Sequence, residues 1–290
     1  MNLLLKLRHR FTYHYMLNEK IIPVMKAALC YRQCDFKRLS PAFDNRSDKI
    51  VIDPLTPFLS NEKILVCGWP KAGNTWVQAL FSEYFSIPLI QPFLDQNRSG
   101  VASNHFAPGI DILYRQDIKR CVFIVRDIRD IVCSYYHYAA TPFHLIYVNA
   151  NYDPESTIEQ FYYDYFIKVI LKRYRWFDTF HMYNEYGTPL IRYEDLLNDP
   201  FEEFKKLLLK SAIVVDPNRL QRSIKNTSFK RLKKKGVSAG EWGKTMFPDM
   251  PISHFRKGKS GGWRLELPVA IQNDIAQRFG QIMDELGYQV

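Results

Sequence analysis

The sequence has 290 residues, of which 47% are hydrophobic and 15% aromatic, and its formal net charge is +10. This apolar content supplies a large core and argues against a disordered chain, and the length suits one α/β domain or a domain with a small appendage. The positive charge suits a polyanionic ligand, a nucleic acid or an anionic membrane, without choosing among them.

The five cysteines are an odd number without metal-like pairing, which argues against both a disulfide framework and a metal site. Cys67 and Cys121 fall inside apolar, strand-like runs and are expected to be buried small residues. No apolar stretch reaches the roughly 20 residues that span a bilayer, and residues 1–10 do not resemble a signal peptide. We therefore expect a cytoplasmic protein, in which residues 1–34 pack on the domain or form a surface-seeking helix.

The predicted elements begin after an irregular lead. We place this lead at residues 1–60 and the domain at 61–290, because residues 35–62 are polar and punctuated by prolines. Residues 63–68 are a short apolar run that ends in glycine, which predicts a buried strand. One face of a predicted helix then carries Trp76, Val77, Leu80, Phe81 and Tyr84.

A second strand is predicted at 121–125, and the apolar spacing from Ile128 to Tyr135 predicts the helix that follows it. The remaining predictions are helices at 157–177, 200–211 and 268–286 and a strand at 188–193. Strands that alternate with helices indicate a single α/β domain with a central parallel β-sheet flanked by helices. Ligands of such sheets bind at the carboxyl ends of the strands, beside a helix N-terminus.

Residues 68–76 (Gly-Trp-Pro-Lys-Ala-Gly-Asn-Thr-Trp), the phosphate loop, connect the first predicted strand to its helix. At such a junction, backbone N–H groups point at an anion and the helix dipole adds positive potential. Gly73 allows close approach of the backbone, Lys71 adds a full charge, and Thr75 adds a hydroxyl donor. The segment predicts a P-loop-like phosphate site, with an ordinary Pro/Gly turn as the simpler alternative.

Gly68 and Gly73 have the spacing of a Walker A loop, but the lysine lies elsewhere. A Walker A loop continues with Lys-Ser/Thr after its second glycine, whereas Asn74 and Thr75 follow here and the lysine is Lys71. The hydroxyl that would hold Mg²⁺ is therefore not in its usual place. This favours a phosphate loop that works without a metal, and a P-loop kinase remains the alternative.

Arg126 follows the second predicted strand, where it can make bidentate contacts to a phosphate. Ser134 lies about two helical turns further on and faces the same ligand only if Arg126 reaches forward. Asp127 and Asp130 offer a simpler interpretation of this segment, an ion-paired helix start.

Together these segments resemble the sulfotransferase family, which transfers a sulfonate group from 3′-phosphoadenosine 5′-phosphosulfate (PAPS). Residues 70–76 closely resemble its 5′-phosphosulfate loop, and residues 125–137 resemble its 3′-phosphate site. Residues 192–196, 226–229 and 255–263 resemble, in the right order, the segments that meet adenine, hold the base and ribose, and close over the 3′-phosphate. The Arg-Lys-Gly signature in the last segment and the lack of a membrane anchor make the cytosolic branch the best match.

This resemblance implies PAPS as the donor, with no metal. The residues that it implies for the donor site are Lys71, Ala72, Gly73, Asn74, Thr75, Trp76, Arg126, Ser134, Tyr193, Thr227, Phe229, Phe255, Arg256, Lys257 and Gly258. Within that set, Arg126, Ser134 and Arg256 would serve the 3′-phosphate, and Tyr193 would meet the adenine.

Sulfonate transfer needs a base for the acceptor proton and cations for the leaving phosphate. Residues 101–108 loosely resemble the segment in which the family places its base, which makes His105 the candidate, although Ser103 stands where the family has lysine. Lys71 would stabilise charge on the bridging oxygen. His137 is the runner-up, and a purely structural histidine is the simpler interpretation.

The acceptor is expected to be a small amphipathic or aromatic molecule with a hydroxyl or amine group. The aromatic residues that could line its pocket are Phe85, Phe93, Phe106, Phe143 and Tyr147. A glycan acceptor and a peripheral membrane contact remain open, whereas no nucleic-acid motif is present and no nucleic-acid partner is expected.

Two departures from the family pattern matter. Gly262 replaces an aspartate of the last segment, and the family's dimerisation segment is poorly matched, which leaves the oligomeric state open. A nucleotide-binding relative without catalysis is the second alternative function.

Overall fold

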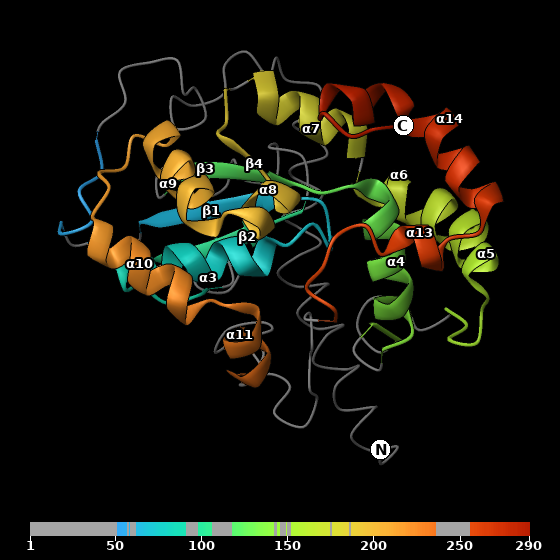
Figure 1. Ribbon diagram of the computed structural model, residues 1–290, viewed down its shortest axis with the longest axis horizontal. Helices are drawn as coiled ribbons and strands as arrows, with labels where there is room; N and C mark the ends of the chain where they lie inside the picture. The colour runs from blue at the N-terminus through green and yellow to red at the C-terminus, as the bar shows by residue number, and fades with distance from the viewer. Residues whose placement is uncertain are drawn as a thin grey trace.

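A parallel sheet of four strands lies at the centre of the part of the chain that the structure describes (Figure 1). This computed structural model describes residues 51–56, 58, 62–90, 98–105, 118–141, 144–145, 149, 152–174, 176–185, 187–235 and 256–290. The strands are β1 (Lys63–Gly68), β2 (Gly100–Asn104), β3 (Ile118–Val125) and β4 (Leu190–Arg192). Their order is β2-β1-β3-β4 and every neighbouring pair is parallel. The predicted α/β class with a central parallel sheet is confirmed.

Helices surround this sheet. Those described are α3 (Asn74–Phe85), α4 (Ile128–Ala139), α5 (Ile158–Gln160), the π-helix η6 (Phe161–Ile170), α6 (Leu171–Tyr174), α7 (Trp176–Glu185), α8 (Tyr193–Asn198), α9 (Pro200–Lys210), α10 (Pro217–Asn226), α11 (Phe229–Lys235), α13 (Trp263–Glu266) and α14 (Val269–Glu285). None of these helices is long and apolar enough to cross a membrane.

The helices cover both faces of the sheet (Figure 1). On one face α3 packs against β1 and β2 and is itself covered by α10. On the other, α7 places Phe180 and Tyr183 against Phe123 of β3, with ring centroids 6.4 Å and 4.9 Å from that of Phe123. Every residue of β1 is buried, as expected for a central strand covered on both sides.

The predicted strand at 63–68 is confirmed, and the strand predicted at 121–125 begins earlier, at Ile118. The third predicted strand is shorter than 188–193, because the chain enters α8 at Tyr193. Cys67 and Cys121 are buried as expected, with their Sγ atoms 3.5 Å apart.

The predicted helical face at the start of the domain is confirmed. Val77, Leu80, Phe81 and Tyr84 are all fully buried. Trp76 is partly buried and packs against the same core, and its ring is nearly perpendicular to that of Tyr193, with the ring centroids 5.8 Å apart.

Candidate functional site

The predicted site residues meet at one edge of the sheet, because parallel strands end on the same side. His105 follows β2, the phosphate loop follows β1, Arg126 follows β3 and Tyr193 follows β4. The strand order therefore places these four in a row, with the phosphate loop and Arg126 in the middle.

The phosphate loop turns tightly before α3. The Ala72 N–H donates to the carbonyl oxygen of Trp69 at 3.1 Å, and both Lys71 (φ 71°) and Gly73 (φ 111°) have left-handed backbones. A Cβ atom on Gly73 would lie 2.7 Å from a ring carbon of Tyr193, so that both conformation and space require glycine. No side chain caps α3, and the N–H of Trp76 donates to the carbonyl oxygen of Gly73 at 2.9 Å, so the N–H groups of Asn74 and Thr75 are the ones that an anion at this helix start would use.

Lys71 lies in strongly positive surroundings. Its ammonium is 4.3 Å above the centre of the Tyr138 ring. Burial, followed by the nearby positive charges of Arg126 and Arg256, lowers the pKa of Lys71 to about 7. Three cations from segments far apart in the sequence are thus close enough to repel one another, as expected of a site built to hold an anion.

Arg126 joins the phosphate loop to the C-terminal loop (residues 256–262). Its guanidinium donates to the carbonyl oxygens of Lys71 at 3.3 Å and Lys259 at 3.0 Å, and it lies 4.3 Å from the centre of the Tyr193 ring. Its Nε is buried and has no hydrogen-bond partner among the described residues. Arg126 therefore has one buried N–H donor with which it can contact a ligand.

Glu266 gathers three cationic side chains. Its carboxylate accepts from Arg256 Nη1 at 2.8 Å and Lys257 Nζ at 2.6 Å, and it lies 3.0 Å from His137 Nε2. Partial burial opposes ionisation, but the hydrogen bonds from Arg256, Lys257 and His137 lower the pKa of Glu266 to about 2. We call these four residues the Glu266 cluster.

Asp130, on the first turn of α4, organises the C-terminal loop. It accepts from the N–H of Gly261 at 2.7 Å, the N–H of Trp263 at 3.2 Å and the hydroxyl of Ser260 at 3.1 Å. The sequence suggested only a helix-start charge for this residue. It thus supplies a carboxylate to a loop in which Gly262 stands where the family has aspartate.

Ser134 lies on α4 between two residues that contact the C-terminal segment. Asp130 is four positions before it and His137 three positions after it, which places all three on one helix face. Since Asp130 contacts Gly261 and His137 contacts Glu266, the structure brings Ser134 to the same side of α4 as the C-terminal loop.

His105 is anchored to the phosphate loop. Its Nδ1 is 2.9 Å from the carbonyl oxygen of Gly68. A carbonyl oxygen only accepts, so Nδ1 carries the proton of this bond and Nε2 keeps its lone pair. Burial is the first cause that lowers the pKa of His105; the Gly68 bond opposes it and the charge of Lys71 adds to it. The imidazole is thereby held neutral, in the form that can accept a proton at Nε2.

Asn74 completes this arrangement, which the sequence did not reveal. Its Nδ2 donates to the same Gly68 carbonyl at 3.2 Å and lies 3.1 Å from His105 Nδ1. Two donors therefore converge on one oxygen, and with the proton on Nδ1 the approach of Asn74 Nδ2 to His105 Nδ1 is a contact without a hydrogen bond. Asn74 was predicted only as part of the phosphate loop.

The residues expected near the adenosine differ in what the structure shows of them. Gly258 (φ 62°) lies so close to Phe229 that a Cβ atom would be 2.4 Å from that ring, which joins two predicted donor segments. Thr227 is buried and its hydroxyl donates to the carbonyl oxygen of Ser223 at 2.8 Å. Phe255 lies outside the described residues.

Phe85 does not line an acceptor pocket. It is buried at the C-terminal end of α3, away from the phosphate loop, and packs against Phe58, Phe81 and Tyr84. The expectation that it faces the acceptor was wrong, because the helix turns this ring into the core. The other aromatic residues predicted there, Phe93, Phe106, Phe143 and Tyr147, lie outside the described residues.

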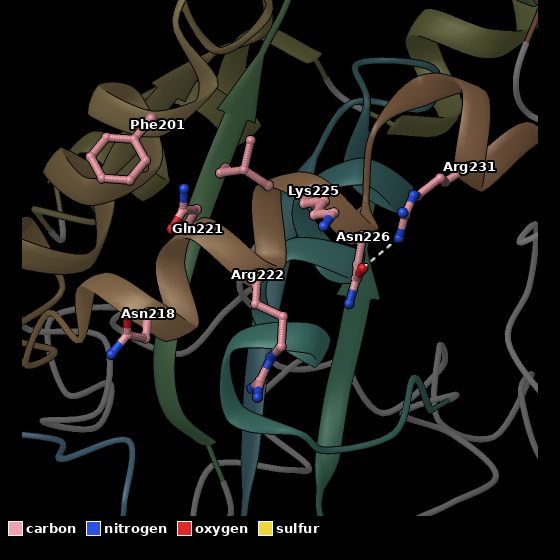
Figure 2. Close-up of a pocket in the computed structure, with 8 residues that line it drawn as sticks. Phe201, Asn218, Gln221, Arg222, Lys225, Asn226 and Arg231 are labelled. Atoms are coloured by element: carbon pink, nitrogen blue, oxygen red, sulfur yellow. Dashed lines mark hydrogen bonds between the residues drawn. The ribbon is translucent and has the colours of Figure 1, made fainter.

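A cleft of about 640 Å³ opens beside α10 and α11, at a different place (Figure 2). Arg222, Lys225 and Arg231 line it, and Arg231 bonds to the side chain of Asn226 at 2.7 Å. Asn226, which begins the segment expected to hold the base and ribose, is among its lining residues, whereas no residue of the phosphate loop lines it.

Comparisons with known proteins identify the family. Residues 113–287 match the model of the sulfotransferase domain. The chain is 26% identical to human sulfotransferase 1C2 over 253 residues, which are 76% of this chain and 81% of that protein. It is 23% identical to human sulfotransferase 2A1 over 254 residues, which are 79% of this chain and 86% of that protein.

Two solved structures share the fold. Mouse sulfotransferase SULT7A1 complexed with PAP superposes with a TM-score of 0.58 and 19% identity, covering 84% of this chain and 90% of that one. Retinol dehydratase in complex with androsterone and the inactive cofactor PAP gives a TM-score of 0.58 and 15% identity, covering 78% of this chain and 81% of that one. Because the sulfotransferase domain model covers more than half of the sequence, the chain belongs to the sulfotransferase family.

Proposed function

We propose that the protein transfers a sulfonate group from PAPS to a hydroxyl or amine of a small acceptor, with His105 as the general base. The observation that carries this proposal is the row of groups at the sheet edge, where a neutral imidazole, the phosphate loop and Arg126 follow neighbouring strands. Relatives complexed with PAP support the choice of donor.

The residues at this edge fit a donor with two separate anionic groups. Lys71 and the backbone N–H groups of residues 73–75 would hold the 5′-phosphosulfate, because the end of the loop and the helix N-terminus present donors there, next to Ala72. Arg126, Ser134, Arg256 and Lys257 would hold the 3′-phosphate, where Arg126 has a buried donor without a partner among the described residues. Trp76, Tyr193, Thr227 and Phe229 would surround the adenosine.

In the proposed mechanism, Nε2 of His105 takes the proton of the acceptor hydroxyl. The Gly68 carbonyl holds the proton on Nδ1, which fixes the tautomer and lets the imidazolium that forms keep its hydrogen bond. Lys71 follows the neighbouring strand, where its charge would stabilise the leaving oxygen. When bound, PAPS would supply the sulfonate group, and the nucleotide PAP would be the leaving group through its 5′-phosphate oxygen.

A small amphipathic alcohol is the acceptor class that we favour. Retinol dehydratase, a structural neighbour, is in complex with androsterone in one structure and with retinol in another. A P-loop kinase is not favoured, because Asn74 occupies the place of the Walker A lysine.

The 3′-phosphate tests this proposal by binding alone. Adenosine 3′,5′-bisphosphate (PAP) is expected to bind far more tightly than adenosine 5′-phosphate, because Arg126 and Arg256 serve the extra phosphate. Isothermal calorimetry of the two nucleotides measures the difference, with adenosine 2′,5′-bisphosphate as a control of equal charge. Equal affinities for PAP and the 5′-phosphate would overturn the assignment of the donor.

Donor binding is also expected to take up a proton near neutral pH. In the protein without donor, burial and the charges of Arg126 and Arg256 lower the pKa of Lys71 to about 7, so the amine is mostly neutral at pH 8, whereas a bound anion would raise that pKa and recharge the amine. The contribution of Lys71 to the affinity should therefore be complete below about pH 6 and be lost as the pH rises above 7. Calorimetry of PAP at pH 8, where its phosphates are fully ionised, in buffers of different ionisation enthalpy measures the uptake.

Lys71→Arg is the matched control for this uptake, because a guanidinium stays charged at both pH values. The variant should bind PAP without proton uptake at pH 8. Uptake that persists in the variant would show that another group titrates.

A further inference from the structure

Arg256 and Lys257, which we assign to the 3′-phosphate, already have an anionic partner within the protein. The Glu266 carboxylate contacts both at 2.8 Å and 2.6 Å, one oxygen for each side chain. His137 approaches the oxygen that Arg256 uses, at 3.0 Å. One carboxylate thus takes up donors that a phosphate would need.

The three cationic side chains of the Glu266 cluster are more exposed than the Glu266 side chain, which would let them exchange the carboxylate for a bound anion. The Glu266 side chain is 16% exposed, whereas those of Arg256, Lys257 and His137 are 30%, 52% and 45% exposed. A ligand can therefore reach the three cationic side chains more easily than the carboxylate. Two further carboxylates of this region have other partners: Asp130 accepts from the N–H groups of Gly261 and Trp263, and Glu194 accepts from the N–H of Asp127 and the hydroxyl of Tyr288.

We propose that Glu266 is an internal anion that competes with the 3′-phosphate of the donor for Arg256 and Lys257, and thereby limits the affinity for 3′-phosphorylated nucleotides. This inference rests on the proposed function, in which these two cations serve the 3′-phosphate. The competition has two parts. The cations give up or share their contacts with Glu266, and the carboxylate and the phosphate repel each other.

Stability alone is a weak explanation for the Glu266 cluster. Partly exposed ion pairs contribute little to folding, and α13 is a helix of only four residues. Arg256 is also close enough to Lys71 to lower the pKa of that amine, which places the cluster electrostatically within the donor site.

The test replaces Glu266 with the isosteric amide. Glu266→Gln should bind PAP about tenfold more tightly than the unchanged protein, because the competing charge is removed and the cations remain. Its affinity for adenosine 5′-phosphate should not change, since that nucleotide lacks the 3′-phosphate. Calorimetry of both nucleotides gives the ratio, and Glu266→Ala is measured alongside in case the amide variant folds poorly.

Glu203→Gln is the matched control. Glu203 also pairs with a lysine, Lys206, but on α9, which lies at a distance from α13 in Figure 1. It should leave both affinities unchanged.

The outcomes separate this inference from the proposed function. Suppose that the protein without substitution prefers PAP to the 5′-phosphate. If folded Glu266→Gln and Glu266→Ala then bind PAP no more tightly than that protein, the competition alone is overturned. If the unchanged protein shows no such preference, the proposed donor site fails and the competition with it.

Discussion

His105→Ala is expected to lower turnover by about 10²- to 10⁴-fold, because an acceptor hydroxyl is a poor nucleophile until a positioned base removes its proton. The affinity for PAP should change little, since Lys71, Arg126 and Arg256 hold the donor. Steady-state rates with PAPS and an acceptor, together with calorimetry of PAP, separate the two effects. The residue's Nδ1 contact with Gly68 is the structural basis for this expectation.

The same residue should set the acid side of the rate profile. Protonated His105 cannot take the acceptor proton, so kcat/KM falls as the pH drops through the pKa of His105. Burial, opposed by the Gly68 bond and aided by Lys71, lowers that pKa, which places the midpoint below the ordinary value of about 6.5. In His105→Ala this acid limb should disappear.

His181→Ala serves as the control for His105→Ala. His181 lies on α7 with about half of its side chain exposed, 3.7 Å from a Glu285 carboxylate oxygen. It should keep normal turnover. A normal rate in His105→Ala together with a large loss in His137→Ala would move the base to the runner-up position.

Arg126→Ala is expected to weaken PAP binding by about 2–4 kcal/mol, the loss of a charge-assisted bidentate contact in a partly dry site. Part of the loss arises because Arg126 also donates to the carbonyl oxygens of Lys71 and Lys259, so that its removal loosens both loops. Calorimetry measures the affinity, and thermal unfolding without ligand checks that the fold survives.

Two further variants show whether the planar guanidinium at this position causes the loss of affinity. Arg126→Lys keeps the charge but not the planar fork, so it should recover only part of the affinity. Arg278→Ala removes a half-exposed arginine on α14 whose partner is Asp274, and it should bind PAP normally. A folded Arg126→Ala protein with unchanged PAP affinity would support the helix-start interpretation instead.

The sequence predicted the parts of the fold that have strong patterns. Residues 63–68 and 121–125 are continuous apolar runs, as expected of strands buried on both faces. β2 was missed because Gly100–Asn104 is a short, mostly small and polar stretch beside the long apolar strands. Helix α10 was also missed, although Asp216 caps it and Pro217 begins it, because few of its side chains are buried.

Residues 157–177, predicted as one helix, show a different limit. The structure has α5, the π-helix η6 and α6, and then α7, which runs on to Glu185. Apolar spacing locates such a segment but does not distinguish the hydrogen-bond pattern of a π-helix from that of an α-helix. The segment was correctly expected to be helical, but its subdivision could not be predicted.

The candidate site was predictable where it consists of motifs on single segments, as for Lys71 and Arg126. The contacts of Asn74 with His105, of Asp130 with Gly261 and of Glu266 with His137 were not, because each joins segments that only the fold brings together. A single sequence carries no pattern that reports such pairs. The same reasoning explains the error on Phe85, whose direction depends on the packing of α3.

Product analysis tests the central claim most directly. The protein is incubated with PAPS labelled in its sulfonate group and a panel of small alcohols, phenols and amines, and the products are read by mass. We predict that one class of acceptor gains the labelled sulfonate, and that the yield collapses in His105→Ala while PAP binding persists. Transfer of phosphate from a nucleoside triphosphate, with no sulfonated product from any acceptor although PAP binds, would contradict the account.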